Sequence, residues 1–390
     1  MPIISGACLG VTGHLFTFAQ RRIFRQAKIS AGGSKMPKIL FLTVHRPNRS
    51  PSQRFRFEQY LPYLEENGFE CRHFFLLDEE DDNTFYSKGK MISKLFLALK
   101  GAQKLFKLSR DANDYDFIFI QRECFMLGTS YFEKRFSKSK ARLIYDFDDS
   151  IWLLDVSNAN KAFAWLKNPD KTSKIISLSN TVVTGNEYLA RYAKQFNQNV
   201  KIIPTTVNTD QYYKTKTNDG NKICIGWSGS LTTIKHFETA VPFLKKLKNK
   251  YGDKLIIKVM GDENYTNSDL EIKGIKWSSE TELDVLSTFD IGIMPLPNDQ
   301  WAKGKCGLKG LLYMSIEIPT IMSPVGVNTE IIKDGENGFL AASKEEWINK
   351  LSDLIESKTL REKIGKAGRE TVVNKFSVES QKNNYLNLFK

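Results

Sequence analysis

The stretch ICIGWSGSLTTIKHF, residues 223–237, indicates the fold of this chain most directly. It opens with an apolar run of strand length, passes through Gly226 and Gly229, and continues as a helical pattern from Thr232 or Thr233. A strand that leads through a glycine turn into a helix is the repeating unit of a parallel α/β sheet. Such a turn admits a ligand to the backbone and favours an anion, although many similar turns bind nothing.

The same alternation of strand and helix continues towards the C-terminus. Two of the helical stretches open with Ser-x-x-Glu capping boxes, at Ser279/Glu282 and Ser343/Glu346. Strands are expected near residues 222–227, 254–260, 272–276, 290–294, 319–322 and 338–341.

The N-terminal half carries the pattern as well. Strands are expected near residues 38–44, 70–77, 116–121, 142–147, 181–184 and 200–203. Helices are expected over residues 53–67, 90–109, 127–137, 158–178 and 186–196. The fold class is therefore α/β, with two doubly wound, Rossmann-like domains that face each other across a cleft. We expect an N-terminal domain over 36–205, a C-terminal domain over 206–375 and a last helix over 376–390.

Residues 1–35 differ from the rest of the chain. They are basic and weakly amphipathic, and they precede MPKILFLTV, which starts at Met36 and is typical of a buried first strand. Their positive charge follows the apolar stretch instead of preceding it, which argues against a secretory signal. Two interpretations stay open: an extension that is foreign to the protein, or a helix that lies in a membrane interface.

Composition excludes several classes of protein. The 390 residues include 41% hydrophobic side chains, enough for two cores, and no apolar run approaches the roughly 20 residues that span a bilayer. Five dispersed cysteines and four histidines give no zinc or disulfide pattern and favour a reducing cytoplasm. The formal charge of +13 comes from scattered lysines. We therefore expect an anionic membrane surface or a phosphate-bearing ligand as partner, and no nucleic acid.

Lysines gather where the C-terminal half presents its strand ends. Lys303, Lys305 and Lys309 lie in one glycine-rich loop, and residues 323–328 follow the next strand, with Glu330 just beyond. Three lysines in one turn repel one another unless an anion lies between them, so a diphosphate is the expected ligand. The alternative is a solvated basic loop.

The N-terminal half offers arginines and aspartates at its strand ends. Arg46, Arg49, Arg54 and Arg56 surround an expected helix N-terminus, where they can bind the phosphate groups of a ligand or remain surface charge. Asp146, Asp148 and Asp149 follow another strand and can bind a hydroxyl group of a ligand, accept its proton, or cap a helix. Arg122, Glu123 and Asn186 are minor candidates.

The motifs together resemble a known family. IGWSGSLTTIKHF, KGKCGLKGLLYM (303–314), GVNTEII (326–332) and DGENG (334–338) match the donor domain of family 4 glycosyltransferases, which have the GT-B fold. SPSQRFRFEQYLPYLEENGFE (50–70) and LIYDFDDSIW (143–152) are similar to a bacterial branch of that family. The resemblance covers nearly everything from Met36 onward and implies that the last helix crosses back to the first domain.

The resemblance also implies roles for single residues. The catalytic set is Asp148, Lys235 and Lys309, and the donor-binding set is Gly229, Ser230, Lys305, Gly307, Leu308, Asn328 and Glu330. The acceptor side holds Arg46, Arg54, Arg56, Asp146 and Asp149. In three places the sequence departs from the family. Ser230 stands where a basic residue is common, and the paired glutamates that usually hold sugar and ribose fall on Gly304 and Leu312.

The reaction implied by the resemblance is transfer of a sugar from a nucleotide-diphosphate-sugar to a hydroxyl, with retention of configuration (EC 2.4). The expected acceptor is a glycan or a lipid-linked hydroxyl in polysaccharide or lipopolysaccharide assembly, at the inner face of the cell membrane. Neither a metal nor a cofactor besides the donor is expected, because lysines and helix N-termini supply positive charge. Two alternatives remain, a nucleotide-sugar-binding protein of little or no activity and a sugar-nucleotide epimerase.

Overall fold

A computed structural model describes residues 35–87, 89–153, 168–215 and 222–390. The contacts between residues divide the chain into two units, Met1–Met36 and a compact unit over Pro37–Lys390. The helices and strands that the structure describes all lie in the second unit. The segment expected as an extension therefore lies almost entirely outside the described residues, as do residues 158–167 of one expected helix. The domain limits at 205/206 and 375/376 stay predictions.

A six-stranded parallel sheet forms the first lobe, and its order is β2-β1-β3-β4-β5-β6. Its strands match the expected ones to within one residue. They are β1 (Lys38–His45), β2 (Glu70–Leu77), β3 (Phe117–Gln121), β4 (Arg142–Phe147), β5 (Thr181–Thr184) and β6 (Val200–Ile202). The apolar runs FIFIQ and LIYDF are buried on both faces, as a central parallel strand requires.

The helices of this lobe are α2 (Pro51–Arg54), α3 (Leu61–Glu66), α4 (Glu79–Tyr86), α5 (Met91–Arg110), α6 (Tyr131–Phe136), α7 (Asp170–Leu178) and α8 (Glu187–Ala193). The single helix expected over 53–67 is wrong, because Pro62 cannot continue a helix and instead lies in the first turn of α3. The sequence analysis missed α4, although Asp78 and Asp81 form a capping box there.

The second lobe is a five-stranded parallel sheet of order β13-β12-β11-β7-β8. Its strands are β7 (Ile223–Ser228), β8 (Leu255–Met260), β11 (Ile291–Met294), β12 (Thr320–Met322) and β13 (Phe339–Leu340). The strand expected near 272–276 does not join this sheet. Its first residues, β10 (Ile272–Lys273), pair instead with β9 (Thr266–Asn267) in an antiparallel hairpin.

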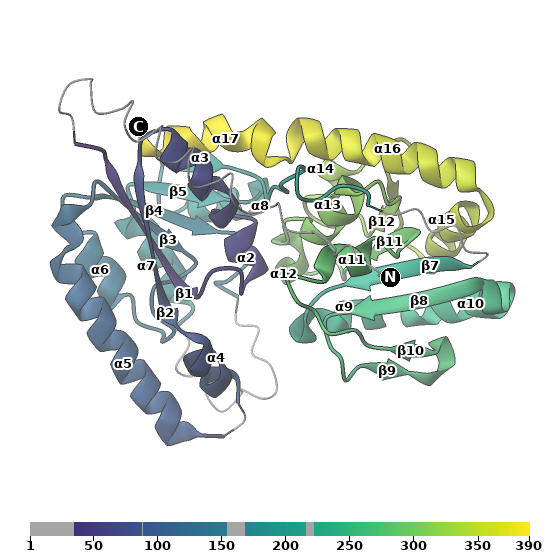
Figure 1. Cartoon of the computed structure of the whole chain (residues 1–390), viewed down its shortest axis with the longest axis horizontal. Helices are drawn as coiled ribbons and strands as arrows, with labels where there is room; N and C mark the ends of the chain where they lie inside the picture. Colours follow the sequence, from purple (N-terminus) through teal and green to yellow (C-terminus); the bar gives the residue numbers. More distant parts are fainter. Residues whose placement is uncertain (1–34, 88, 154–167, 216–221) are drawn as a thin grey trace, which may run out of the picture. The chain divides into compact units, whose positions relative to one another are not determined.

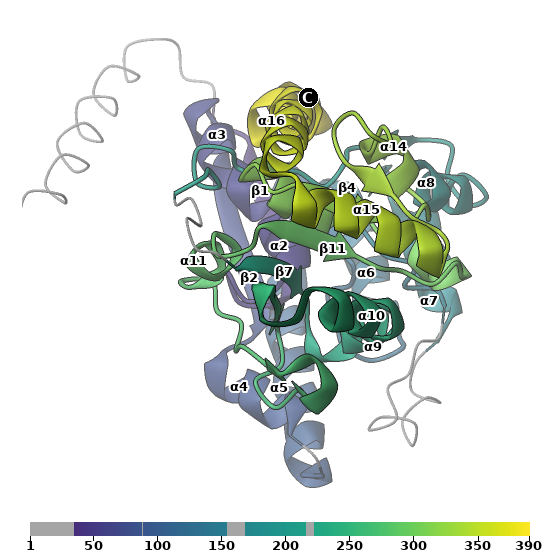
Figure 2. The ribbon, with the colours of Figure 1, turned by 90° about the vertical axis from the view of Figure 1, so that its right-hand side faces the viewer.

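Helices cover both faces of the second sheet. They are α9 (Ile234–Glu238), α10 (Val241–Tyr251), α11 (Glu282–Leu286), α12 (Gln300–Lys303), α13 (Leu308–Ser315), α14 (Asn328–Ile331), α15 (Lys344–Glu356) and α16 (Lys358–Lys375). The helices α10 and α15 share one core, whereas α13 and α16 pack on the opposite face. Figure 2 views the second lobe from the side, with α10, α15 and α16 nearest to the viewer. The capping box at Ser343/Glu346 is confirmed. The box at Ser279/Glu282 is wrong, because α11 starts only at Glu282, whose carboxylate binds other partners.

The last helix, α17 (Val378–Leu386), continues beyond α16 and contacts the first lobe (Figure 1). The ring of Tyr385 stacks on that of Tyr60 with centroids 4.1 Å apart, and Phe389 joins the same core as Phe41. The chain therefore crosses from the second lobe back to the first, and its last residues pack in the core of the first lobe.

The strand order of each sheet reverses direction beside its first strand. Connections run one way from β1 to β2 and the other way from β1 to β3, and the same reversal separates β7 from β8 and β11. Helices on opposite faces of a sheet leave a crevice at such a point, beyond the carboxyl ends of the strands. The loops after β1, β3, β7 and β11 are therefore the places where a ligand is expected.

Within the described residues, no helix combines the length and the apolar character needed to cross a membrane.

Candidate active site at the switch points

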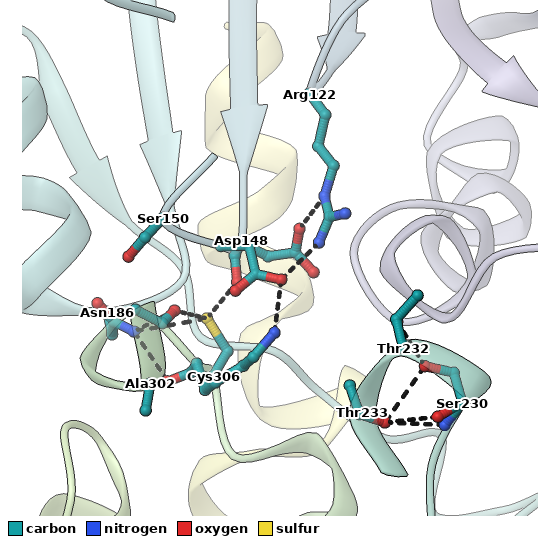
Figure 3. A network of polar contacts seen from close by, with 12 residues as sticks. Arg122, Asp148, Ser150, Asn186, Ser230, Thr232, Thr233, Ala302 and Cys306 are labelled. Atoms are coloured by element: carbon teal, nitrogen blue, oxygen red, sulfur yellow. Dashed lines mark hydrogen bonds and ion pairs between the residues drawn. The ribbon is translucent and has the colours of Figure 1, made fainter. Parts of the chain in front are cut away.

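Two carboxylates and an arginine lie at the carboxyl edge of the first sheet (Figure 3). Arg122, just after β3, donates from Nε to Asp148 Oδ1 at 2.8 Å and from Nη2 to Asp149 Oδ2 at 3.3 Å. Arg122 has a φ of 61°, a left-handed conformation that is unfavourable for a side-chain-bearing residue. Backbone strain of this kind concentrates at functional sites and here accompanies a fixed arginine–carboxylate pair.

The charge state of Asp148 follows from its neighbours. Burial disfavours its charged form, but the guanidinium groups of Arg122 and Arg56 outweigh burial and lower its pKa. Asp148 is therefore a carboxylate throughout the neutral range, able to accept a hydrogen bond but a weak proton acceptor.

Two lysines extend the cluster from the second lobe. Lys305 Nζ lies 2.8 Å from Asp149 Oδ2, so this pair joins the two lobes. Lys309 faces an aromatic ring instead, with its Nζ 5.7 Å from the centroid of Trp227. Among the residues described, no carboxylate lies within salt-bridge distance of Lys309, and burial together with Lys305 lowers its pKa to about 8.

The loop that carries these lysines is fixed by close backbone packing. Gly307 has a φ of 72° and opens α13, so its position favours glycine. A Cβ on Gly304 would lie 2.0 Å from Ser150 Oγ of the first lobe. Asn186 reinforces the contact by donating to the carbonyls of Gly304 and Lys305. The glycines of KGKCGLKG thus allow the loop to press against the first lobe while α13 starts towards the site.

A cavity of about 430 Å³ opens at the switch point of the second sheet. It is lined by Leu153, Lys235, His236, Pro297, Asp299, Gln300 and Trp301. Among the described lining residues, Leu153 alone comes from the first lobe, while the others follow β7 or β11, where the strand order places a ligand crevice.

His236 is the residue of this cavity that sequence reasoning missed. It is 4% exposed, and neither of its ring nitrogens has a hydrogen-bond partner in the part of the chain that the structure describes. Burial, followed by Lys309 and Lys305, lowers its pKa to about 4, so the imidazole is neutral near pH 7 with one donor and one acceptor unused. The signal was available in the sequence, because His236 directly follows Lys235.

The glycine turn after β7 closes one wall of the site. A Cβ on Gly229 would lie 2.1 Å from the ring of Trp227, so only glycine fits there without a shift. Ser230 is exposed and forms a reciprocal cap with Thr233 at the start of the short helical turn Leu231–Thr233 (Figure 3). Lys235 follows on α9, where it is exposed to solvent and lines the cavity.

Arg56 and Asp146 lie beneath the site. Their side chains are 1% and 0% exposed, and they form a two-bonded ion pair in which Arg56 Nη1 also donates to the Ile203 carbonyl. Burial raises the pKa of Asp146 even though Arg56 acts against that rise. The acceptor contacts expected of both residues stay predictions. The ion pair holds Asp146 within β4, the strand that ends just before Asp148.

The other arginines of the acceptor set engage in ion pairs elsewhere. Arg46 binds Asp82 at 3.1 Å and Glu79 at 3.3 Å. Arg54 reaches the second lobe, where it donates to Glu282 Oε2 at 3.1 Å and to the Tyr212 hydroxyl at 2.8 Å. Neither contact joins these arginines to Asp148, and their acceptor roles stay predictions.

The last part of the donor set follows β12. Asn328 is fully buried, donates to the Ser323 carbonyl at 3.0 Å, and leaves its Oδ1 unpaired on the side of Gly307. Glu330 is exposed on α14. The structure therefore joins Asp148, Asp149 and Lys305 through Arg122 and puts Lys309 close enough to Lys305 for its pKa to be lowered. It places Lys235 on the wall of the cavity and Glu330 at the surface.

The sequence of the second lobe is similar to a known family. Residues 208–371 match the family described as Glycosyl transferases group 1. Spore coat protein SA of Bacillus subtilis (strain 168) is 20% identical over 281 residues, which cover 62% of this chain and 72% of that protein. The second lobe is therefore the part of the chain that is similar to group 1 glycosyltransferases.

Solved structures share the fold of both lobes. Sucrose-phosphate synthase from Thermosynechococcus elongatus superposes with a TM-score of 0.66 at 13% identity, over 90% of this chain and 98% of that one. HepE of Anabaena, solved with UDP-glucose, gives a TM-score of 0.60 at 13% identity, also over 90% and 98%. The expected pair of Rossmann-like domains in a GT-B arrangement is thereby confirmed.

Proposed function

We propose that this chain, a glycosyltransferase with the GT-B fold, moves a sugar from a nucleotide-diphosphate-sugar to a hydroxyl of a glycan or lipid-linked acceptor, with retention of configuration. The observation that carries the donor assignment is Lys309, a lysine with no carboxylate within salt-bridge distance among the described residues, whose pKa is lowered to about 8 by burial and by Lys305. An anion bound between these two side chains would restore the charged form of Lys309. The diphosphate of a nucleotide-sugar is such an anion, and the structure of HepE holds UDP-glucose.

The same cations serve the chemistry. As the bond from sugar to diphosphate breaks, negative charge grows on the leaving phosphate, and fixed positive groups lower the barrier by stabilising that charge. Lys235, Lys305 and Lys309 supply the charge from side chains, and the N-terminus of α13, at Leu308, supplies backbone N–H groups. On the opposite side, the carboxylate of Asp148 orients the acceptor hydroxyl.

We propose that the reaction needs no metal ion. A divalent cation would bind carboxylates, but the two at the edge of the first sheet already pair with protein cations, Asp148 with Arg122 and Asp149 with Arg122 and Lys305. Both carboxylates would have to give up these partners to bind a metal.

The two missing glutamates have a structural explanation. Gly304 packs against Ser150 of the first lobe, where any side chain would collide, and Leu312 is buried in the core below α13. Neither position can hold a carboxylate that reaches a ligand. We propose that His236 and Asp299, both on the cavity wall, bind the hydroxyls of the sugar in their place. A binding protein without turnover remains the second candidate, because it would need the cavity and the lysines alone.

A donor screen tests the proposal. We expect one family among UDP-, GDP- and ADP-sugars to raise the melting temperature, since a ligand at 100 times its Kd adds about 2.7 kcal/mol to the stability of the folded state. The shift should disappear in Lys235→Ala, persist in the surface control Lys276→Ala, and be equal with Mg²⁺ or a chelator. Absence of a shift with every donor would contradict the donor assignment, and a shift that requires Mg²⁺ would contradict the metal-free mechanism.

A further inference from the structure

Helix α5 exposes an apolar stripe that no other described part of the fold covers. Five large apolar side chains within its first nine residues are between 53% and 73% exposed. These residues are Met91, Ile92, Leu95, Phe96 and Leu99. Their spacing places them on one face of the helix, while Leu97, Leu105 and Leu108 on another face are buried in the core of the first lobe. A monomeric protein rarely exposes such a continuous patch unless it binds something.

The charged side chains of α5 itself are all basic, and the acidic residues nearest to them belong to α4. The sequence of α5, MISKLFLALKGAQKLFKLSR, contains no acidic residue. Lys100 and Lys104 pair with Asp81 at the start of α4, but Lys94 and Lys107 form no salt bridge within the described residues. Long lysine side chains at the edge of an apolar face can extend towards an anionic surface while their methylene groups cover apolar area.

We propose that the apolar stripe of α5 docks on a membrane that contains anionic lipids, with the five apolar side chains inserted and the flanking lysines at the headgroups. Charge favours an anionic membrane over the two other candidates that could cover the stripe, which are the N-terminal segment of the chain and a second copy of it. Residues 1–36 of the chain contain no Asp or Glu and would bring further positive charge to a positive face. A second copy docked through the same stripe would place lysines against lysines.

The stripe lies at the end of the lobe where the acceptor is expected. It occupies the N-terminal half of α5, which follows α4 and thus the carboxyl end of β2, and α4 and α5 adjoin there in Figure 1. Asp148 lies beyond the carboxyl end of β4 in the same parallel sheet, on the same edge. A docked α5 would therefore present that edge to lipid-linked acceptors. This last step rests on the proposed function, whereas the docking itself does not.

Vesicle binding by the full-length chain tests the docking. We expect co-sedimentation with vesicles of phosphatidylcholine and phosphatidylglycerol, and at least about tenfold weaker binding to phosphatidylcholine alone. The double variant Leu95→Gln/Phe96→Gln should lose at least about tenfold in binding to the anionic vesicles, because it removes two inserted side chains. Phe196→Gln, which changes a phenylalanine that is 40% exposed elsewhere on this lobe, should bind like the wild type.

Three outcomes would overturn the proposal. They are absence of binding to anionic vesicles, binding that the double variant retains in full, and a wild-type dimer in light scattering that the double variant converts to monomer. The second would assign membrane binding to another segment, and the third would assign the stripe to a second copy. Donor-induced thermal shifts measured on the same variants should match those of the wild type. Vesicle binding therefore tests the docking alone, and the thermal shift tests the donor assignment alone.

Discussion

Replacement of Lys309 by alanine is expected to lower kcat/KM for the nucleotide-sugar by about 10²–10³-fold, the usual cost of removing one fixed group that stabilises developing charge. Lys309 is half-buried, lies close enough to Lys305 for its pKa to be lowered, and has no carboxylate within salt-bridge distance among the described residues. Its charge is therefore available to a ligand and not spent on a structural ion pair. Initial rates at varied donor concentration, at fixed acceptor, measure the effect.

A matched control lies in the same loop. Lys303, the last residue of α12, forms no salt bridge within the described residues. Lys303→Ala should stay within about threefold of wild type if the position of Lys309 over Trp227 and beside Lys305 is what matters. Equal losses for the two variants would show that general positive charge, and not the position of Lys309, is responsible.

The pKa of Lys309 adds a second readout. Because that pKa is about 8 in the free protein, Lys309 is charged below this pH and neutral above it. Affinity for the nucleoside diphosphate should therefore weaken as the pH rises from 7 to 9, and Lys309→Ala should flatten this part of the profile. Calorimetric titration at several pH values measures it. A profile that is identical in wild type and variant would contradict the placement of the phosphates beside Lys309.

The second large effect concerns stability. Asp146→Ala is expected to cost about 3–5 kcal/mol in the free energy of unfolding, because it leaves the guanidinium of Arg56 buried without its counter-charge. Both side chains are at most 1% exposed, so solvent cannot replace the lost partner. Urea unfolding followed by circular dichroism measures the change. The surface pair Lys350–Asp334 supplies the control, since Asp334→Ala should cost about 1 kcal/mol or less.

The same variant distinguishes two roles for Asp146. If it is mainly structural, stability falls by the expected amount and the acceptor KM of the surviving folded protein changes little. If it contacts the acceptor, as the family resemblance implies, stability stays near that of the wild type and the acceptor KM rises. The second result would contradict the account of Arg56 and Asp146 as a support beneath β4.

Much of the fold followed from the sequence because buried parallel strands are short, apolar and separated by turns. The runs at Lys38–His45 and Ile223–Ser228 have that form, and their limits were predicted to within one residue. Helix limits were predicted less well, since Pro62 divides one stretch and acidic capping starts α4 where apolar periodicity is weak. The hairpin of β9 and β10 was missed because pairing depends on a partner that is not encoded in the strand itself.

The candidate site was predictable in part for a similar reason. Lysines and aspartates at strand ends indicated where charge would gather, and topology brings those ends together. What sequence could not give is the pairing. Arg56 with Asp146 and Arg122 with Asp148 join residues 90 and 26 positions apart, and only the folded chain shows which charges are already neutralised. The unpaired nitrogens of His236 are equally a property of the surroundings.

Direct detection of sugar transfer tests the central claim. The full-length chain would be incubated with radiolabelled donor, of the nucleotide family that the thermal screen identifies, and with glycan or lipid-extract acceptors, and the anomeric configuration of the product would be read by NMR. We expect label in an acceptor product with the configuration of the donor, formed by the wild type and strongly reduced in Lys309→Ala. Tight donor binding without any labelled product, or release of nucleotide with an epimerised sugar in the absence of acceptor, would contradict it.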